Sequence, residues 1–234
     1  MKKKILIGIL IAISFFASII MYFVITDLKE ESKLKKEMTE VSSMIRSNNM
    51  DMKAFNARLN TTKTKGDYAV VEKAFKNYLK DFFANIVDII DILDDKKITN
   101  SLTVENYIAD GPDFTNTKSY IEETSNKLEK DKSSYYNFFE EDKIMSYLKK
   151  DGLDSYYKDL YRDEIIGDIN DIKNDKSLEE SIEKVVKMLD SSKKVIDFLA
   201  NNKSSWKVEG EQILFSSQSL LDEYNSLVAE LTKY

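Results

Sequence analysis

YAVVEKAFKNYLKDFFANIVDIIDILDD, residues 68–95, is the most apolar segment of this chain after its N-terminus. Apolar side chains recur in it every three or four residues, which is the spacing of one face of an α-helix. This stripe consists of Val71, Phe75, Leu79, Phe82, Ile86, Ile89, Ile90 and Leu93. A helix with such a face has to bury it, so we expect residues 68–95 to lie at the centre of a helical bundle.

A heptad pattern precedes this segment. Steps of four and three residues connect Leu34, Met38, Val41, Ile45, Asn48, Met52, Phe55 and Leu59. A polar residue within such a seam, here Asn48, can fix the register of the helices that pack there. The Leu34–Leu59 seam could pair with a second copy in an oligomer or pack within the chain. Because few charged pairs flank it, we favour packing within the chain.

Further helices are predicted downstream. A turn at Asp110–Asp113, which holds the only proline, separates the central helix from one over residues 115–150 with a bend near 127–133. A shorter helix is expected over 154–173 and a strong one over 178–201. The seam of this last helix consists of Leu178, Ile182, Val185, Leu189, Ser192, Ile196 and Leu199.

One β-like pattern stands out near the C-terminus. Apolar residues alternate with polar ones on both sides of Gly210, which predicts a small hairpin near residues 205–215 and then a final helix to about Leu231. The fold class expected from the whole pattern is all-α, an elongated helical bundle with this minor β-hairpin.

The stretch SSWKVEGEQILFSSQSLLDEYNSL, Ser204–Leu227, contains that hairpin pattern. It resembles the C-terminal signature of uncharacterised single-pass membrane-anchored helical proteins from low-GC Gram-positive bacteria. The resemblance covers about a tenth of the chain. It implies a tethered helical protein and no particular activity.

The N-terminus carries the most apolar segment. Residues 5–26, ILIGILIAISFFASIIMYFVIT, contain no charge and follow Lys2, Lys3 and Lys4. At about 1.5 Å per residue the run is long enough to cross a hydrocarbon core about 30 Å thick. A cleaved signal peptide is the alternative, but its apolar region is usually shorter, so we favour an uncleaved transmembrane helix.

The flanking charges predict an orientation. Lysines gather before residues 5–26, which by the positive-inside rule places residues 1–4 in the cytoplasm and the helical domain of residues 27–234 outside. No proline or glycine lies between residue 26 and the heptad seam. We therefore expect the transmembrane helix to continue into one long helix that ends near residue 60, and we expect a single-pass cell-membrane location.

Composition excludes several kinds of activity. The 234 residues include no His and no Cys, which removes the common neutral-pH acid–base group and the usual ligands of zinc, copper and haem. Nucleotide-binding glycine loops and serine-nucleophile motifs are missing from the sequence. The net charge of −6 argues against a nucleic-acid partner. We therefore expect no catalytic residues, no cofactor and no metal site.

Aromatic residues supply the candidate interaction surface. Tyrosine combines a large contact area with a polar tip and is enriched at protein interfaces. The candidates are Tyr135, Tyr136, Phe139, Tyr147, Tyr156, Tyr157, Tyr161 and Trp206. The alternative is that these rings fill the core between two helices, and that Trp206 anchors the hairpin.

Function is therefore predicted only broadly. The sequence favours a non-enzymatic interaction or scaffold module of the cell envelope that binds a protein or a cell-wall component outside the membrane. A ligand-sensing or regulatory ectodomain that acts through a membrane partner is one alternative. A toxin-immunity protein is another.

Overall fold

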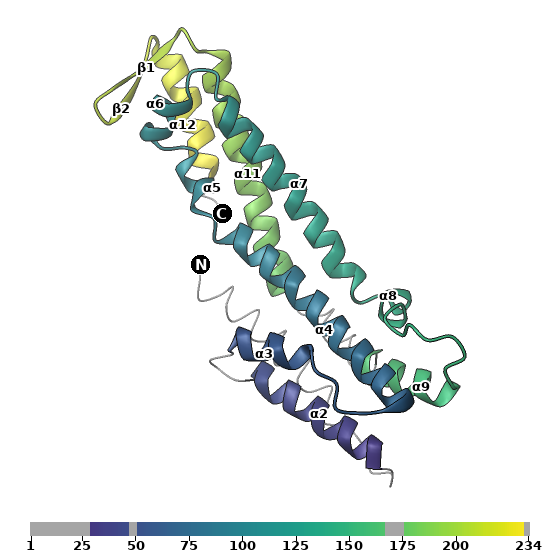
Figure 1. Ribbon diagram of the computed structural model, residues 1–234. Coiled ribbons are helices and arrows are strands. Elements are labelled where there is room, and N and C mark those ends of the chain that lie inside the picture. Colours follow the sequence, from purple (N-terminus) through teal and green to yellow (C-terminus); the bar gives the residue numbers. More distant parts are fainter. Residues whose placement is uncertain (1–28, 47–50, 167–175, 232–234) are drawn as a thin grey trace. The chain divides into compact units, whose positions relative to one another are not determined.

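A computed structural model describes residues 29–46, 51–166 and 176–231, and these form a mostly helical structure (Figure 1). The chain divides into two compact units. Unit 1 draws on Met1–Val87 and Ser133–Leu178, and unit 2 on Asp88–Lys132 and Glu179–Tyr234. Each unit therefore combines two parts of the chain that are distant in sequence.

The central helix forms as its apolar stripe predicts. Helix α4 runs over Gly66–Leu93, two residues off the predicted bounds at each end. Every member of the stripe except Ile90 is buried, and Leu79, Phe82 and Ile89 are completely so. The helix supplies the core of unit 1 up to Val87 and then contributes its last turn to unit 2.

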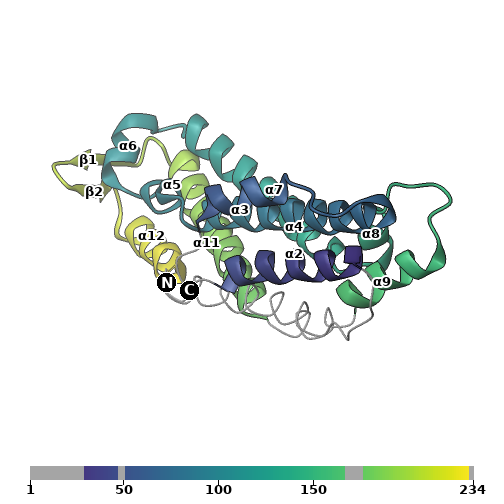
Figure 2. The ribbon, with the colours of Figure 1, turned by 60° about the horizontal axis from the view of Figure 1, so that its bottom comes forward.

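Unit 1 surrounds its part of α4 with shorter helices, and two views show α2 and α3 beside α4 (Figures 1 and 2). These elements are α2 (Lys29–Arg46), α3 (Met52–Leu59), α8 (Glu141–Met145) and α9 (Ser155–Ile166). The last residues of α7 (Thr115–Asn137) also belong to unit 1.

The prediction of one long helix through the heptad seam is wrong. Helix α2 ends at Arg46, and Asp51 begins a separate helix by accepting hydrogen bonds from Lys53 N at 2.9 Å and Ala54 N at 3.0 Å. The backbone of Asp51 is extended (φ −76°, ψ 97°), so the helix cannot run through it. The capping carboxylate therefore starts α3 as a new element.

Most of the heptad seam is nevertheless buried within unit 1. The buried members are Leu34, Met38, Val41, Phe55 and Leu59. Met52 is an exception, because 40% of it is exposed. Asn48 lies outside the described residues, so its proposed effect on register, like the oligomer through this seam, stays a prediction.

Unit 2 is built on α11 and the first part of α7. Helix α11 covers Ser177–Asn201, and the other elements of the unit are α5 (Lys96–Asn100), α6 (Val104–Asp110), β1 (Trp206–Glu209), β2 (Gln212–Phe215) and α12 (Gln218–Leu231). All seven residues of the predicted α11 seam are buried. The minor β-hairpin is confirmed: the strands pair antiparallel, with Trp206 opposite Phe215 and Val208 opposite Ile213, and Gly210 takes the positive φ of 61° that its tight turn requires.

The helix predicted over residues 115–150 is interrupted. Its expected bend near 127–133 does not occur, and α7 runs unbroken to Asn137 before the chain turns at Glu140, whose backbone is extended. The carbonyl of Phe138, released from the helix ladder, accepts a hydrogen bond from the Tyr78 hydroxyl at 3.1 Å. A tertiary contact therefore satisfies the backbone where the helix ends.

Unit 1 also buries an ionic network. Lys76, which is 1% exposed, extends from α4 to the carboxylate of Glu37 on α2, to Glu72 Oε1 at 2.7 Å and to the carbonyl of Thr61 at 3.0 Å. Arg58 of α3 donates to Glu37 Oε1 at 2.7 Å. One lysine thus connects α2, α4 and the connection between α3 and α4.

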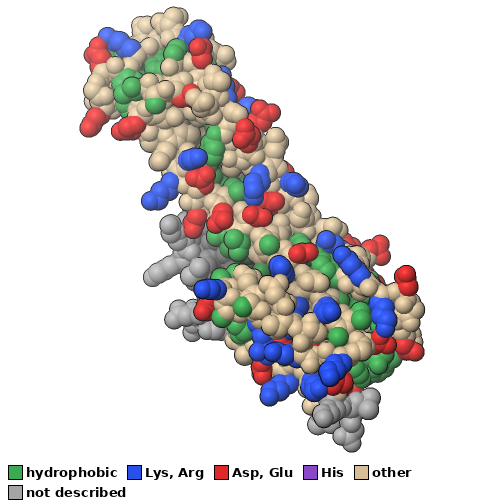
Figure 3. All heavy atoms as spheres, in the orientation of Figure 1, with side chains coloured by type: hydrophobic (Ala, Val, Ile, Leu, Met, Phe, Trp, Pro, Cys, Tyr) green, Lys and Arg blue, Asp and Glu red, His purple; other side chains and the backbone are tan. Residues whose placement is uncertain are grey.

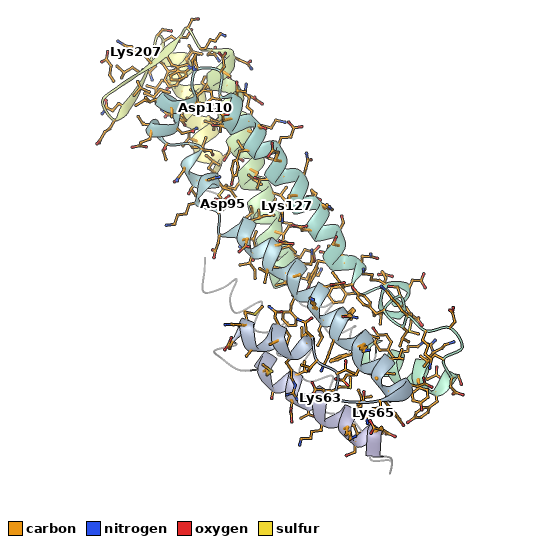
Figure 4. All side chains as sticks on the ribbon, viewed as in Figure 1. Lys63, Lys65, Asp95, Asp110, Lys127 and Lys207 are labelled. Carbon is orange, nitrogen blue, oxygen red and sulfur yellow. The ribbon has the colours of Figure 1, made fainter. Side chains whose placement is uncertain are left out.

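Glu72 extends this network to the backbone of the connection, near Lys63 and Lys65 in Figure 4. Its Oε2 accepts from Lys63 N and Thr64 N, each at 2.9 Å, and from Thr64 Oγ1 at 2.7 Å. Burial alone would raise the pKa of the Glu72 carboxyl, but hydrogen bonds from Lys76, Thr64 and Lys63 outweigh it and hold the pKa below its ordinary value. Glu72 is therefore charged in the fold at neutral pH.

The predicted single-pass membrane location is corrected by the structure. Across residues 29–46, 51–166 and 176–231, none of the helices is both long enough and apolar enough to span a bilayer. Even α4 carries charged side chains along its length, among them Glu72, Lys76 and Asp81. Residues 5–26 and the tail of residues 1–4, on which the location and orientation were predicted, lie outside the described residues.

The buried lysine generates a prediction. We expect Lys76→Met to lower the free energy of unfolding by about 3–5 kcal/mol, because it leaves two buried carboxylates without their shared cation. Lys73→Met, on an exposed position of the same helix, should stay within about 0.5 kcal/mol of the original chain. Urea unfolding followed by circular dichroism measures both, and equal effects would contradict the structural role of Lys76.

Candidate functional site

Half of the aromatic residues that the sequence marks as an interaction surface lie in the core of unit 1. Tyr135, Phe139, Tyr147 and Tyr161 are each at most 9% exposed. Phe82 of α4 lies against two of them, with ring centroids 6.0 Å from Tyr135 and 6.0 Å from Phe139. These four rings are packing residues and offer no free surface.

The hydroxyl groups of two of these tyrosines form hydrogen bonds within unit 1. The Tyr161 hydroxyl donates to the Ile144 carbonyl at 3.0 Å, and the Tyr147 hydroxyl donates to Asp81 Oδ2 at 2.8 Å. Burial raises the pKa of both hydroxyls far above the ordinary tyrosine value. They therefore act as neutral hydrogen-bond donors that join α8 and α9 to the rest of unit 1.

The remaining tyrosines are more accessible. Tyr136 is 38% exposed and Tyr156 is 46% exposed. The Tyr156 hydroxyl donates to the buried Glu31 at 3.2 Å, and Tyr157 packs edge-on against Tyr68 with centroids 5.0 Å apart. Tyr156 and Tyr157 therefore belong to one cluster at the start of α9, which the structure does not combine with Tyr136.

Trp206 occupies a different environment, in unit 2. Its indole Nε1 donates to the Leu199 carbonyl at 2.8 Å, which attaches β1 to the end of α11. The ring stacks on Phe114 (centroids 5.9 Å apart, planes 23° apart) and lies 6.3 Å from the ring of Tyr107. Trp206 therefore anchors the hairpin, which is the alternative role that the sequence suggested for it. Part of its surface remains accessible.

The chain adopts an unusual backbone around this anchor. Phe114 has a φ of 55°, which is rare for a bulky residue, and it is completely buried. A Cβ at Gly111 would lie 2.4 Å from the Tyr107 carbonyl oxygen and 3.1 Å from the Trp206 ring, so only glycine fits there without a shift of the backbone. Close packing of Tyr107, Phe114 and Trp206 therefore holds a locally strained turn in place.

A small pocket opens beside Trp206, which we call the hairpin pocket. It measures about 300 Å³ and is lined by Tyr107, Ile108, Gly111, Pro112, Lys203, Trp206 and Val208. Ile108 at its edge is 65% exposed, the most of any large apolar residue in the described part of the chain. Apolar side chains reach the surface at the end of unit 2 that carries the hairpin (Figure 3).

A second and larger pocket lies between α5, α6 and the start of α7; we call it the polar pocket. Its volume is about 740 Å³, within the usual range of small-molecule sites. It is lined by Lys97, Asn100, Ser101, Thr103, Glu105, Asn106, Ala109, Asn116, Thr117 and Tyr120. The sequence did not identify this pocket, although the Asn, Ser and Thr residues gathered around residues 99–117 were an available signal.

Two aspartates stabilise the walls of the polar pocket, and Figure 4 labels both. Asp95 caps α5 through Lys97 N at 2.9 Å and accepts from the Tyr120 hydroxyl at 2.8 Å. Asp110 accepts from Thr117 N at 2.7 Å and Asn116 N at 3.2 Å, so it serves as the N-terminal cap that Phe114 cannot provide for α7.

The capping hydrogen bonds of Asp110 determine the direction in which its pKa is shifted. Burial raises the pKa of its carboxyl, but the hydrogen bonds from Thr117 and Asn116 outweigh burial and hold the pKa below the ordinary aspartate value. A carboxyl whose pKa is lower in the folded state stabilises the fold above its unfolded pKa, about 3.9, and loses that contribution as the pH falls further.

The described residues give no indication of a metal site, and both signs of charge occur on the surface. Within the described ranges no group of three or more acidic side chains is placed to hold a metal ion. Positive and negative side chains both occur on the face shown in Figure 3. Both pockets offer contact area, and the polar pocket also offers groups that can form hydrogen bonds.

Comparison with known proteins returned no match to any protein-family model, curated protein or solved structure. The resemblance of Ser204–Leu227 to membrane-anchored helical proteins therefore stays a prediction.

A prediction follows for Asp110. We expect Asp110→Asn to destabilise the protein by about 1 kcal/mol at pH 7, because the carboxylate accepts hydrogen bonds through both oxygens and the amide keeps only one acceptor. The difference from the original chain should shrink below about pH 4, because the unfolded chain binds a proton there that the folded carboxyl takes up only at lower pH. Urea unfolding at pH 7 and pH 3.5 measures this.

The neighbouring Asp113 supplies the control. Its carboxylate is 68% exposed and pairs with Lys203, a surface contact worth little. Asp113→Asn should leave stability nearly unchanged at both pH values. A penalty for Asp110→Asn that stays constant down to pH 3.5 would show that the carboxyl charge does not stabilise α7.

Proposed function

We propose that this protein is a non-enzymatic interaction module that binds a partner protein through the hairpin pocket. The observation that carries the proposal is the exposure of Ile108, 65%, at the edge of a pocket formed by Trp206, Tyr107 and Pro112. Ile108 and Pro112 are exposed, and Trp206 and Val208 are half-buried beside them. Such a contiguous apolar patch around an aromatic pocket is typical of protein interaction sites.

Pocket size and lining indicate the kind of contact. A volume of about 300 Å³ suits one apolar side chain of a partner, and Trp206, Tyr107 and Val208 provide apolar walls. Tryptophan and tyrosine dominate binding energy at interfaces because they bury a large area with little loss of side-chain freedom. Lys203 at the rim adds a polar group of the kind that surrounds such anchors.

Rigidity of the pocket supports the proposal. Trp206 is held by its hydrogen bond to Leu199 and by stacking on Phe114, and the hairpin strands are joined in register. A preformed site loses little conformational entropy on binding, so more of the contact energy contributes to affinity. The strained φ of Phe114 is another feature often found at binding sites.

Composition supports a role without catalysis. The chain has no His and no Cys, so the groups that most often act as acid, base or nucleophile near pH 7 are missing from the whole sequence. The four predicted interaction residues that lie in the core take no part in the proposal. Of the residues marked by the sequence, Trp206 is the one on which the binding function depends.

A pull-down with Ile108→Asp tests the proposal. The tagged chain is cross-linked in its own cells, and captured proteins are identified by mass spectrometry. We expect the recovered amount of a partner to be about tenfold or more lower with Ile108→Asp than with the original chain, because a charge replaces an apolar contact residue. Because Trp206 is the only tryptophan, a shift in its emission on titration with the purified partner would localise the contact.

Leu214→Asp is the matched control. Leu214 is 37% exposed, but it lies on the other face of the hairpin from Trp206 and Val208, because side chains alternate along a strand. The partner should be retained with Leu214→Asp. Equal retention with both variants, or recovery of this chain alone, would overturn the proposal.

A further inference from the structure

We propose that the polar pocket binds a short neutral saccharide. This site is separate from the hairpin pocket, because Asn106 and Ala109 of α6 line one pocket while Tyr107 and Ile108 line the other. The proposal does not depend on the partner protein, and either can fail while the other stands.

The lining of the polar pocket defines the chemistry of its ligand. Nine of its ten lining residues are polar, and Ala109 is the exception. Most of these residues are amides and hydroxyls, groups that both donate and accept hydrogen bonds. Sugar hydroxyls do the same, and the carbon stems of the lining side chains supply apolar area for the C–H face of a sugar ring, so a saccharide can use both kinds of surface.

Hydrogen bonds among the walls hold the pocket open before a ligand arrives. Asn106 Nδ2 donates to the Ser101 carbonyl at 2.8 Å and to Thr117 Oγ1 at 3.0 Å, so one amide joins all three helices of the pocket. The Tyr120 hydroxyl is fixed by Asp95 at 2.8 Å. A preformed site of this kind binds a ligand with little cost of reorganisation.

Several groups in the pocket are left for a ligand. Within the part of the chain that the structure describes, the side chains of Asn100 and Glu105 make no hydrogen bond, and both are exposed. The Tyr120 ring is half-buried and lies below the Lys97 ammonium, 5.7 Å from its centroid. The amide and the carboxylate can bond the hydroxyls of a pyranose, and the Tyr120 ring adds apolar surface beside them.

Charge favours a neutral ligand. The pocket holds one cation, Lys97, and one anion, Glu105, so neither sign dominates its lining. Asp95 and Asp110 lie directly behind it, bonded to Tyr120 and Thr117, and they oppose an anionic ligand. A phosphate or a carboxylate ligand would therefore bind less well than an uncharged one.

Titration of the full chain with defined probes tests the proposal. The probes are maltose, cellobiose and N,N′-diacetylchitobiose as neutral saccharides, L-glutamine as a zwitterion and inorganic phosphate as an anion. Binding is followed by calorimetry and by protein NMR shifts. We expect at least one saccharide to bind with a dissociation constant on the order of 1 mM or below, and glutamine and phosphate to bind at least about tenfold more weakly.

Pocket variants show where the saccharide binds. Ala109→Phe fills the pocket from an exposed position and should weaken binding by about tenfold or more. The same change at Ala57, exposed on α3 of unit 1, is the control and should have no effect. Asn100→Ala removes a side chain without internal partners and should weaken saccharide binding by about threefold or more. It replaces Ala109→Phe as the test if that variant does not fold.

Clear outcomes would overturn the proposal. It fails if no neutral saccharide binds, or if Ala109→Phe and Asn100→Ala both bind the saccharide as the original chain does. Stronger binding of glutamine, lost in Lys97→Met and Glu105→Gln, would assign the pocket to a zwitterion instead. Stronger binding of phosphate would assign it to an anion.

Discussion

Packing of unit 1 depends on the burial of Lys76 among Glu37, Glu72 and the Thr61 carbonyl. An ammonium group is costly to remove from water unless its partners are held at the correct distances. This requirement fixes α2 and the connection between α3 and α4 against one turn of α4. Apolar contacts alone would allow these short elements to slide, and the shared lysine allows one arrangement.

In unit 2, too, polar side chains fix the positions of short elements, here at the surface. Helices α5 and α6 are too short to be stable on their own, so polar side chains fix their ends: Asp95 caps α5, and Asn106 bonds to Ser101 and Thr117. The hydrogen bonds that stabilise these helices also shape the polar pocket. Stability and a binding-competent surface therefore come from the same groups.

Periodic apolar patterns predicted most of the helices and the hairpin, but they could not separate core rings from surface rings. Tyr135 and Tyr136 are adjacent in the sequence, yet the first is 6% exposed and the second 38%. The difference arises because Phe82, distant in sequence, covers one ring. The break at Asp51 was missed for a related reason: heptad spacing continues across it, and only the cap shows that a new helix begins.

The sequence alone determined the helical class, the α4 and α11 stripes, the position of the hairpin and the lack of His and Cys chemistry. These properties depend on local spacing and composition. Tertiary structure decided the division into two units, the buried lysine, and which aromatic residues remain accessible. It also created both pockets, because each gathers side chains from segments that meet only when burial of apolar surface brings their helices together.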